Sequence, residues 1–151
     1  MLAPLAVEPA QALDAATEQR VVDGLARLSE ALEASAAPGA EWPVMRRVFG
    51  DKMLVRLLGI GTNSMRRYAG GERGTPDEVA ARLHWLAMVV ADLAGAYNDF
   101  GIRRWFERPR TQLEGKSPRQ TLGAAWSPDG AAAARVRRLA AVLSGPQPLA
   151  A

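Results

Sequence analysis

The side chains that most often carry out catalysis or hold metals are sparse in this 151-residue chain. It has no cysteine and one histidine, His84, so neither a thiolate site nor a cluster of histidine ligands can be assembled. The adjacent acids Asp77 and Glu78 stand at a predicted helix start, where carboxylates stabilise the positive end of the helix. Ser117 and Ser127 each precede a proline, which is typical of helix caps. We therefore expect a protein that is not an enzyme and has no cofactor or metal, with His84 as a packing or interface residue.

Contact with an anionic polymer is the second kind of chemistry that the sequence offers. Net charge is −4 over residues 1–40, +4 over residues 41–75 and +3 over residues 76–151. A polyanion is therefore expected to meet the middle of the chain and not its start. Within that middle, residues 57–74 read LLGIGTNSMRRYAGGERG, which predicts a helix, a glycine turn and a short second helix with adjacent arginines.

This pattern matches the requirements of a helix-turn-helix. A turn at Gly59 places Leu54 and Leu58 on the inner face of the first helix, and Met65 and Tyr68 on the inner face of the second, with Ile60 after the turn. The second helix would then present polar side chains outward. The candidate DNA-binding residues are Thr62, Asn63, Ser64, Arg66, Arg67 and Arg73, and Arg46, Arg47, Lys52 and Arg56 are candidates for phosphate contacts.

The pattern alone leaves a second interpretation open. Exposed arginines on helices are commonly only solvated, and a helix–glycine–helix turn also occurs in small helical proteins that do not bind DNA. The segment would then be a scaffold for another part of the chain.

Hydrophobic periodicity predicts an all-α fold. Apolar residues recur at steps of three and four, whereas β-branched runs are missing. An amphipathic helix is expected over residues 13–36, with Val21, Leu25, Leu28 and Leu32 on one face. Further helices are expected over residues 43–49, 51–59, 76–97, 102–108 and 128–145, with a short one after Ser117-Pro118.

Several details of these helices are testable against a structure. Val44 is expected to be buried in the second helix. Asp51 and Thr75 are expected to cap the helices that follow them. The stripe of the long helix extends to Tyr97, and Val142 is expected to face inward on the last helix, together with Val136, Leu139 and Leu143.

The four tryptophans divide into two groups. Trp85 and Trp105 lie on predicted helices and are expected in the core. Trp126 lies in a loop bounded by serine and proline, so it is expected at a surface that a partner uses. No apolar run reaches 18 residues and the N-terminal stretch lacks a basic start, so neither a membrane span nor a signal peptide is expected.

Residues 101–123, GIRRWFERPRTQLEGKSPRQTLG, carry a family resemblance. The order Trp105, Pro109, Leu113, Gly115, Ser117-Pro118 and Leu122 resembles the toxin-binding C-terminal domain of the MbcA/ParS/Xre antitoxin family, whose usual run is close to W…P…LGGxTPLELL. Residues 57–97 are similar to the helix-turn-helix and long connecting helix of that family. The resemblance covers about residues 44–143; Glu114 and the run after Pro118 depart from the usual pattern.

The resemblance implies an antitoxin of a type II toxin–antitoxin system. Its partner would be a RES-domain toxin that destroys NAD, and the antitoxin would cover the entrance to the active site of that toxin. Many such antitoxins also bind their own operator DNA as dimers, so a homodimer or a hetero-oligomer with the toxin is expected in the cytoplasm. The expected organisation is an N-terminal extension with one helix (1–40), a helix-turn-helix region (41–75), and a long helix with a toxin-binding domain (76–151).

The resemblance also implies a set of toxin-facing residues near the C-terminus. These are Trp105, Arg108, Pro109, Leu113, Lys116, Ser117, Trp126, Arg138, Pro146 and Ala151. The main alternative is a stand-alone helix-turn-helix transcriptional regulator whose C-terminal helices serve dimerisation. A helical adaptor without DNA activity is a third interpretation.

Overall fold

The computed structural model describes residues 15–34 and 36–144, and it divides the chain into two compact units, Met1–Ser35 and Ala36–Ala151. We call the second the core unit. The first unit contains α1 (Ala15–Ala34), whose Val21 and Val22 side chains are exposed. The rest of its predicted stripe, Leu25, Leu28 and Leu32, lies outside the described side chains.

The core unit is built from helices, which confirms the predicted all-α class for the described residues. The only β-type pairing in that part of the chain is an isolated bridge between Arg110 and Lys116. The elements are α2 (Pro38–Phe49), α3 (Asp51–Leu58), α4 (Thr62–Ala69), α5 (Asp77–Ala94), α6 (Asp99–Glu107), the 3-10 turn η1 (Thr111–Leu113), α7 (Pro118–Leu122) and α8 (Ala131–Ser144).

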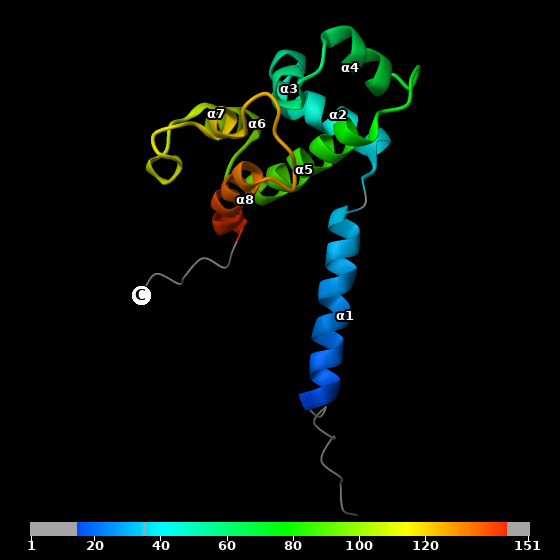
Figure 1. The fold of residues 1–151 in the computed structure, drawn as a ribbon, viewed down its shortest axis with the longest axis vertical. Helices are drawn as coiled ribbons and strands as arrows, with labels where there is room; N and C mark the ends of the chain where they lie inside the picture. Colours follow the sequence, from blue (N-terminus) through cyan, green and yellow to red (C-terminus); the bar gives the residue numbers. More distant parts are fainter. Residues whose placement is uncertain (1–14, 35, 145–151) are drawn as a thin grey trace, which may run out of the picture. The chain divides into compact units, whose positions relative to one another are not determined.

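Helix α5 lies at the centre of the core unit. It contacts α2, α3, α6 and α8, while α4 packs on α2 and α3 (Figure 1). Its apolar side chains occur around most of its circumference, and Leu83, Leu86, Val89 and Leu93 are fully buried. A helix that is apolar on so many sides needs neighbours on several faces, which explains its central place.

Helix α2 begins five residues earlier than the sequence predicts, at Pro38. Pro43 therefore lies inside the helix instead of at its start. The buried face is formed by Trp42, Met45, Val48 and Phe49, and Val44 points away from the core with 37% of its surface exposed. The prediction that Val44 is buried is thus wrong. The large side chains of Trp42, Met45 and Phe49 face the core, and Val44 lies on the adjacent side of the helix.

The predicted caps Asp51 and Thr75 are also wrong. Gly50 occupies the N-cap position of α3 and Asp51 is the first residue of the helix, where its carboxylate bonds to Arg46 instead of the backbone. The hydroxyl of Thr75 does not cap α5 but accepts a hydrogen bond of 3.0 Å from the indole Nε1 of Trp42. In both cases a contact from another helix uses the group that local sequence assigns to a cap.

The ends of α5 and α8 differ from prediction as well. Helix α5 stops at Ala94, so Tyr97 lies beyond it and is 39% exposed. Helix α8 starts at Ala131, so the prediction that Ser127 caps it is wrong: Ser127 O accepts from Gly130 N in the turn before the helix. The buried face of α8 is formed by Ala133, Val136 and Ala140. Val142 is consequently 76% exposed, contrary to the prediction.

Within the described residues no single helix is long and apolar enough to cross a membrane. Helices α5 and α6 meet that criterion only when taken together, and they are bent by 112°.

Candidate functional site

Helices α3 and α4 are joined by the glycine turn that the sequence predicts. Gly59 adopts the left-handed conformation (φ 68°, ψ 35°), and its N–H donates to Val55 O. Leu54, Leu58 and Met65 are fully buried. Ile60 and Tyr68 are partly buried and pack on the same core, so all five predicted inner positions contribute to packing.

The opposite side of α4 is polar and open. Thr62, Asn63, Arg66 and Arg67 are exposed and Ser64 is half-buried; Arg73 is exposed in the loop that follows. Neither Arg66 nor Arg67 forms an ion pair with another residue that the structure describes. Both guanidinium groups are therefore available to an external anion.

Not every predicted phosphate contact is equally available. The guanidinium of Arg46 binds both carboxylate oxygens of Asp51 at 2.8 and 2.9 Å. This hydrogen bonding raises the pKa of Arg46 and lowers that of Asp51, against the smaller effect of desolvation; the charge of Arg66 also helps to lower the pKa of Asp51. Arg47 lies 3.5 Å from a carboxylate oxygen of Asp99. Lys52 and Arg56 are exposed and have no ion pair within the described part of the chain.

Arg82 of α5 and Trp126 both donate hydrogen bonds to the end of α3, and these bonds connect the α3–α4 segment to the C-terminal half. The indole Nε1 of Trp126 donates to Leu57 O at 2.7 Å, and Nη1 of Arg82 donates to Leu58 O at 2.8 Å. These are two of the last carbonyls of α3, which have no partner within the helix. Arg82 also donates to Trp126 O, and its guanidinium lies 5.7 Å from the centre of the Trp126 ring.

The prediction that Trp126 sits at a surface is therefore wrong. Only 4% of its surface is exposed, and its ring packs 4.8 Å from that of Trp85, centre to centre. The side chain bonds to a carbonyl 69 positions earlier in the chain, and no local pattern reports such a contact.

The segment that carries the family resemblance contains a helix cap at Ser117. Its hydroxyl accepts from Gln120 N while the Gln120 side chain accepts from Ser117 N, which forms a capping box at the start of α7 and confirms the predicted cap. Before it, Arg110 and Lys116 pair across a tight loop in which Glu114 has a φ of 58° and Gly115 a φ of 80°. Glu114 thus lies at a position whose backbone favours glycine, the residue that the resembling family usually has there.

The residues that the resemblance assigns to toxin contact fall into three groups. Arg108, Pro109, Lys116 and Arg138 are exposed. Trp105, Leu113, Ser117 and Trp126 are buried, so their contribution in this structure is to shape the surface. Pro146 and Ala151 lie outside the described residues.

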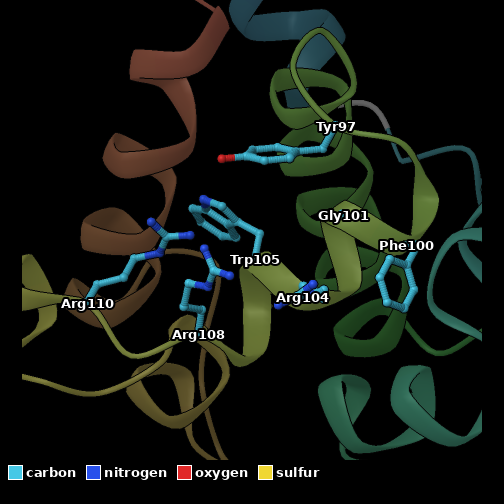
Figure 2. Close-up of a pocket in the computed structure, with 7 residues that line it drawn as sticks. All are labelled: Tyr97, Phe100, Gly101, Arg104, Trp105, Arg108 and Arg110. Atoms are coloured by element: carbon cyan, nitrogen blue, oxygen red, sulfur yellow. The ribbon is translucent and has the colours of Figure 1, made fainter.

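A pocket of about 230 Å³ beside α6 brings together two predicted toxin-facing residues, Trp105 and Arg108, and others that the sequence did not single out (Figure 2). Three arginines line it, Arg104, Arg108 and Arg110, with Tyr97, Phe100 and Trp105. The Cβ that any other residue would add at Gly101 would lie 3.0 Å from Cβ of Tyr97, so this glycine lets Tyr97 pack on the start of α6. The run FGIRRWFERPR, in which arginines are interspersed with aromatic residues, is the sequence signal from which this site could have been predicted.

His84 lies where α5 meets α2, as its predicted packing role implies. Its Nδ1 is 2.7 Å from Oε2 of Glu41, and both side chains are mostly buried. Among the described residues, no group of three or more histidine, aspartate or glutamate side chains could hold a metal ion.

Comparisons with protein-family models, with curated proteins and with solved structures found no match to this chain.

Proposed function

We propose that this chain is the antitoxin of a type II toxin–antitoxin system, with a helix-turn-helix formed by α3 and α4 and a toxin-binding region formed by α6 to α8. The proposal rests on the family resemblance of residues 101–123. The observation that carries the proposal is that most positions of the resembling pattern are buried while residues next to them in the sequence are exposed. The buried residues are Leu113, Ser117, Pro118 and Leu122, and the exposed rim includes Arg108, Pro109 and Lys116.

The partner that the resemblance implies is a RES-domain toxin that degrades NAD in the cytoplasm. The exposed residues of the rim and Arg138 would bind the toxin, and the tail that contains Pro146 and Ala151 would block the entrance to its active site. This mechanism requires no catalytic group or cofactor in the antitoxin. A surface of arginine, proline and lysine on a folded core is suited to such binding, since the backbone that carries these side chains is ordered before the partner arrives.

The proposal expects a RES-domain toxin to be encoded beside this chain, and co-expression of the two is expected to restore growth and the cellular NAD level. A chain truncated after Ser144 is expected to protect less well, because it keeps every described helix but lacks the tail. Truncation after Leu122 is a poorer test, since it removes Trp126 and α8 and with them part of the core.

An unchanged melting temperature of the shortened chain is the control for that experiment. Full protection by the shortened chain would reject the tail as the blocking element. Continued growth arrest with the full chain would reject the antitoxin function itself.

A second candidate function, operator binding, is favoured by the exposed and unpaired Arg66 and Arg67 on α4. Replacing both with alanine is expected to abolish the electrophoretic shift of the upstream promoter at moderate salt. Removing an arginine that binds a base costs about 1–3 kcal/mol, and removing one that binds a phosphate reduces the slope of log K against log salt by about 0.9.

The matched control removes the same two charges elsewhere, at Lys116 and Arg138, and should leave the shift intact. An equally weakened shift in both double variants would point to net charge alone. Absence of a shift with the unaltered chain would leave α3 and α4 as a scaffold.

A further inference from the structure

The pocket beside α6 has a positively charged lining. Arg104, Arg108 and Arg110 contribute to it, and no aspartate or glutamate does. The nearest acids in sequence are engaged elsewhere: Glu107 binds Arg119 at 2.7 Å and Asp99 lies 3.5 Å from Arg47. The charge of the pocket is therefore not balanced by its own walls.

Arg110 is the most constrained of these arginines. Its guanidinium carbon lies 4.7 Å from the centre of the Trp105 ring, a cation–π contact (Figure 2). Its backbone is fixed on both sides, because Arg110 N donates to Lys116 O at 3.0 Å and Gly115 N donates to Arg110 O at 2.9 Å. The side chain is thus held before any ligand arrives.

The same arginine is incompletely satisfied. Its Nε is buried and has no hydrogen-bond partner among the described residues. Burial has the largest effect and lowers the pKa of Arg110. Interaction with Tyr97 opposes this and raises the pKa by less, and the positive charge of Arg108 lowers it slightly further. A partly buried cation beside a second cation is stabilised by an anion that reaches both.

The size and composition of the pocket identify the kind of anion. About 230 Å³ is smaller than the roughly 300–1,000 Å³ of sites that enclose small molecules, and it suits a single side chain. Its rim carries exposed aromatic surface, with Phe100 at 64% and Tyr97 at 39%. Arginine, tyrosine and tryptophan gathered around a small depression are typical of the energetic centre of a protein–protein interface.

We propose that this pocket receives the carboxylate of an aspartate or glutamate side chain from a protein partner, with the guanidinium of Arg110 as its principal ligand and Arg108 as the second. A planar guanidinium matches a carboxylate in two parallel hydrogen bonds. Trp105 supports the Arg110 plane from behind, and Phe100 and Tyr97 cover apolar surface around the entering side chain. The identity of the partner as the toxin rests on the proposed function; the carboxylate site does not.

Titration of the full chain with N-acetylglutamate α-amide tests the site without any toxin. The Arg110 Nε–Hε resonance is expected to be observable by side-chain ¹⁵N NMR, because burial of Nε slows exchange of its hydrogen with solvent. Binding of the carboxylate to the guanidinium is expected to shift this resonance saturably. The neutral probe N-acetylglutamine α-amide should produce none. Arg110→Lys keeps the charge but loses the planar fork, so it should weaken carboxylate binding about tenfold or more, and Arg56→Lys on α3 is the control.

Arg108→Gln provides a second variant, since Arg108 is exposed and its replacement leaves the core intact. It should also weaken binding of the carboxylate probe. A shift of equal size with the neutral probe, or undiminished affinity in both Arg110→Lys and Arg108→Gln, would overturn the proposal.

Calorimetry with the RES-domain protein then separates the pocket from the proposed function. Binding of the toxin about tenfold weaker to Arg110→Lys than to Arg56→Lys would place the toxin in the pocket. Equal toxin binding by these two variants would overturn the pocket as part of that interface and leave the antitoxin function standing. Failure of the unaltered chain to bind the toxin would reject the antitoxin function, while the titration with the glutamate probe still decides whether the carboxylate site exists.

Discussion

Replacing Trp126 with alanine is expected to lower the free energy of unfolding of the core unit by about 3–5 kcal/mol. The indole is almost completely buried, packs on Trp85 and lies under the guanidinium of Arg82. Its removal leaves a cavity and also leaves Leu57 O without the indole donor. Urea unfolding followed by circular dichroism measures the change.

Trp126→Phe separates the two contributions. Phenylalanine keeps much of the packing against Trp85 but has no Nε1 donor, so its cost should be smaller, about 1–3 kcal/mol for the carbonyl left unsatisfied. A change below about 1 kcal/mol in the alanine variant would contradict the buried position of Trp126 and restore the surface role that the sequence suggests.

Substitution of Gly59 by alanine is expected to cost about 2–4 kcal/mol of stability. Two effects add. The left-handed conformation at φ 68° disfavours a side chain, and an added Cβ would lie 3.1 Å from Ala124 O and 3.2 Å from Nη1 of Arg82. Ala124 O belongs to the backbone, so it can move away from the added Cβ only if the loop before Trp126 moves.

Gly71→Ala is the matched control, because Gly71 has a φ of 77° but nothing within 4 Å of an added Cβ. It should show only the conformational part of the cost, about 1–2 kcal/mol. The difference between the two variants in thermal or urea unfolding reports the close approach of the 124–126 loop to the turn. Equal destabilisation would show that the loop does not lie against Gly59 in solution.

Local periodicity was sufficient to predict the helical class and the approximate position of most helices. Leu83, Leu86 and Leu93 recur on one face of the predicted long helix and are all buried in α5. The Ser117-Pro118 cap also followed from adjacent residues alone. Such features are fixed by interactions within one or two turns of helix, which a single sequence displays.

The errors occur where a distant contact overrides a local preference. Thr75 has the side chain of a cap but accepts a hydrogen bond from Trp42, 33 positions away. Val142 continues a helical stripe, yet α8 buries its smaller residues Ala133 and Ala140 where it packs on α5 and α7, because close helix approach favours small side chains at the contact. Composition does not distinguish these choices.

The candidate site shows the same division. The exposed arginines of α4 were identified from the sequence because their place follows from the glycine turn. Of the pocket residues, Trp105 and Arg108 were predicted but Arg110 was missed, since the pocket forms only when the chain after Pro109 folds back so that Arg110 covers Trp105. Arg82 was also missed, although it bonds to backbone carbonyls on two different segments.

The bond between Trp126 and Leu57 has a consequence for how the protein is made. The two residues are 69 positions apart, and a ribosome adding about 5–20 residues per second needs roughly 3–14 s to cover that interval. During that time the end of α3 lacks the donor that completes it, and the apolar surface around Leu57 and Leu58 is not yet fully covered. The core unit therefore cannot be completed until Trp126 has been synthesised, and a product that ends before this residue is expected to expose apolar surface to chaperones and proteases.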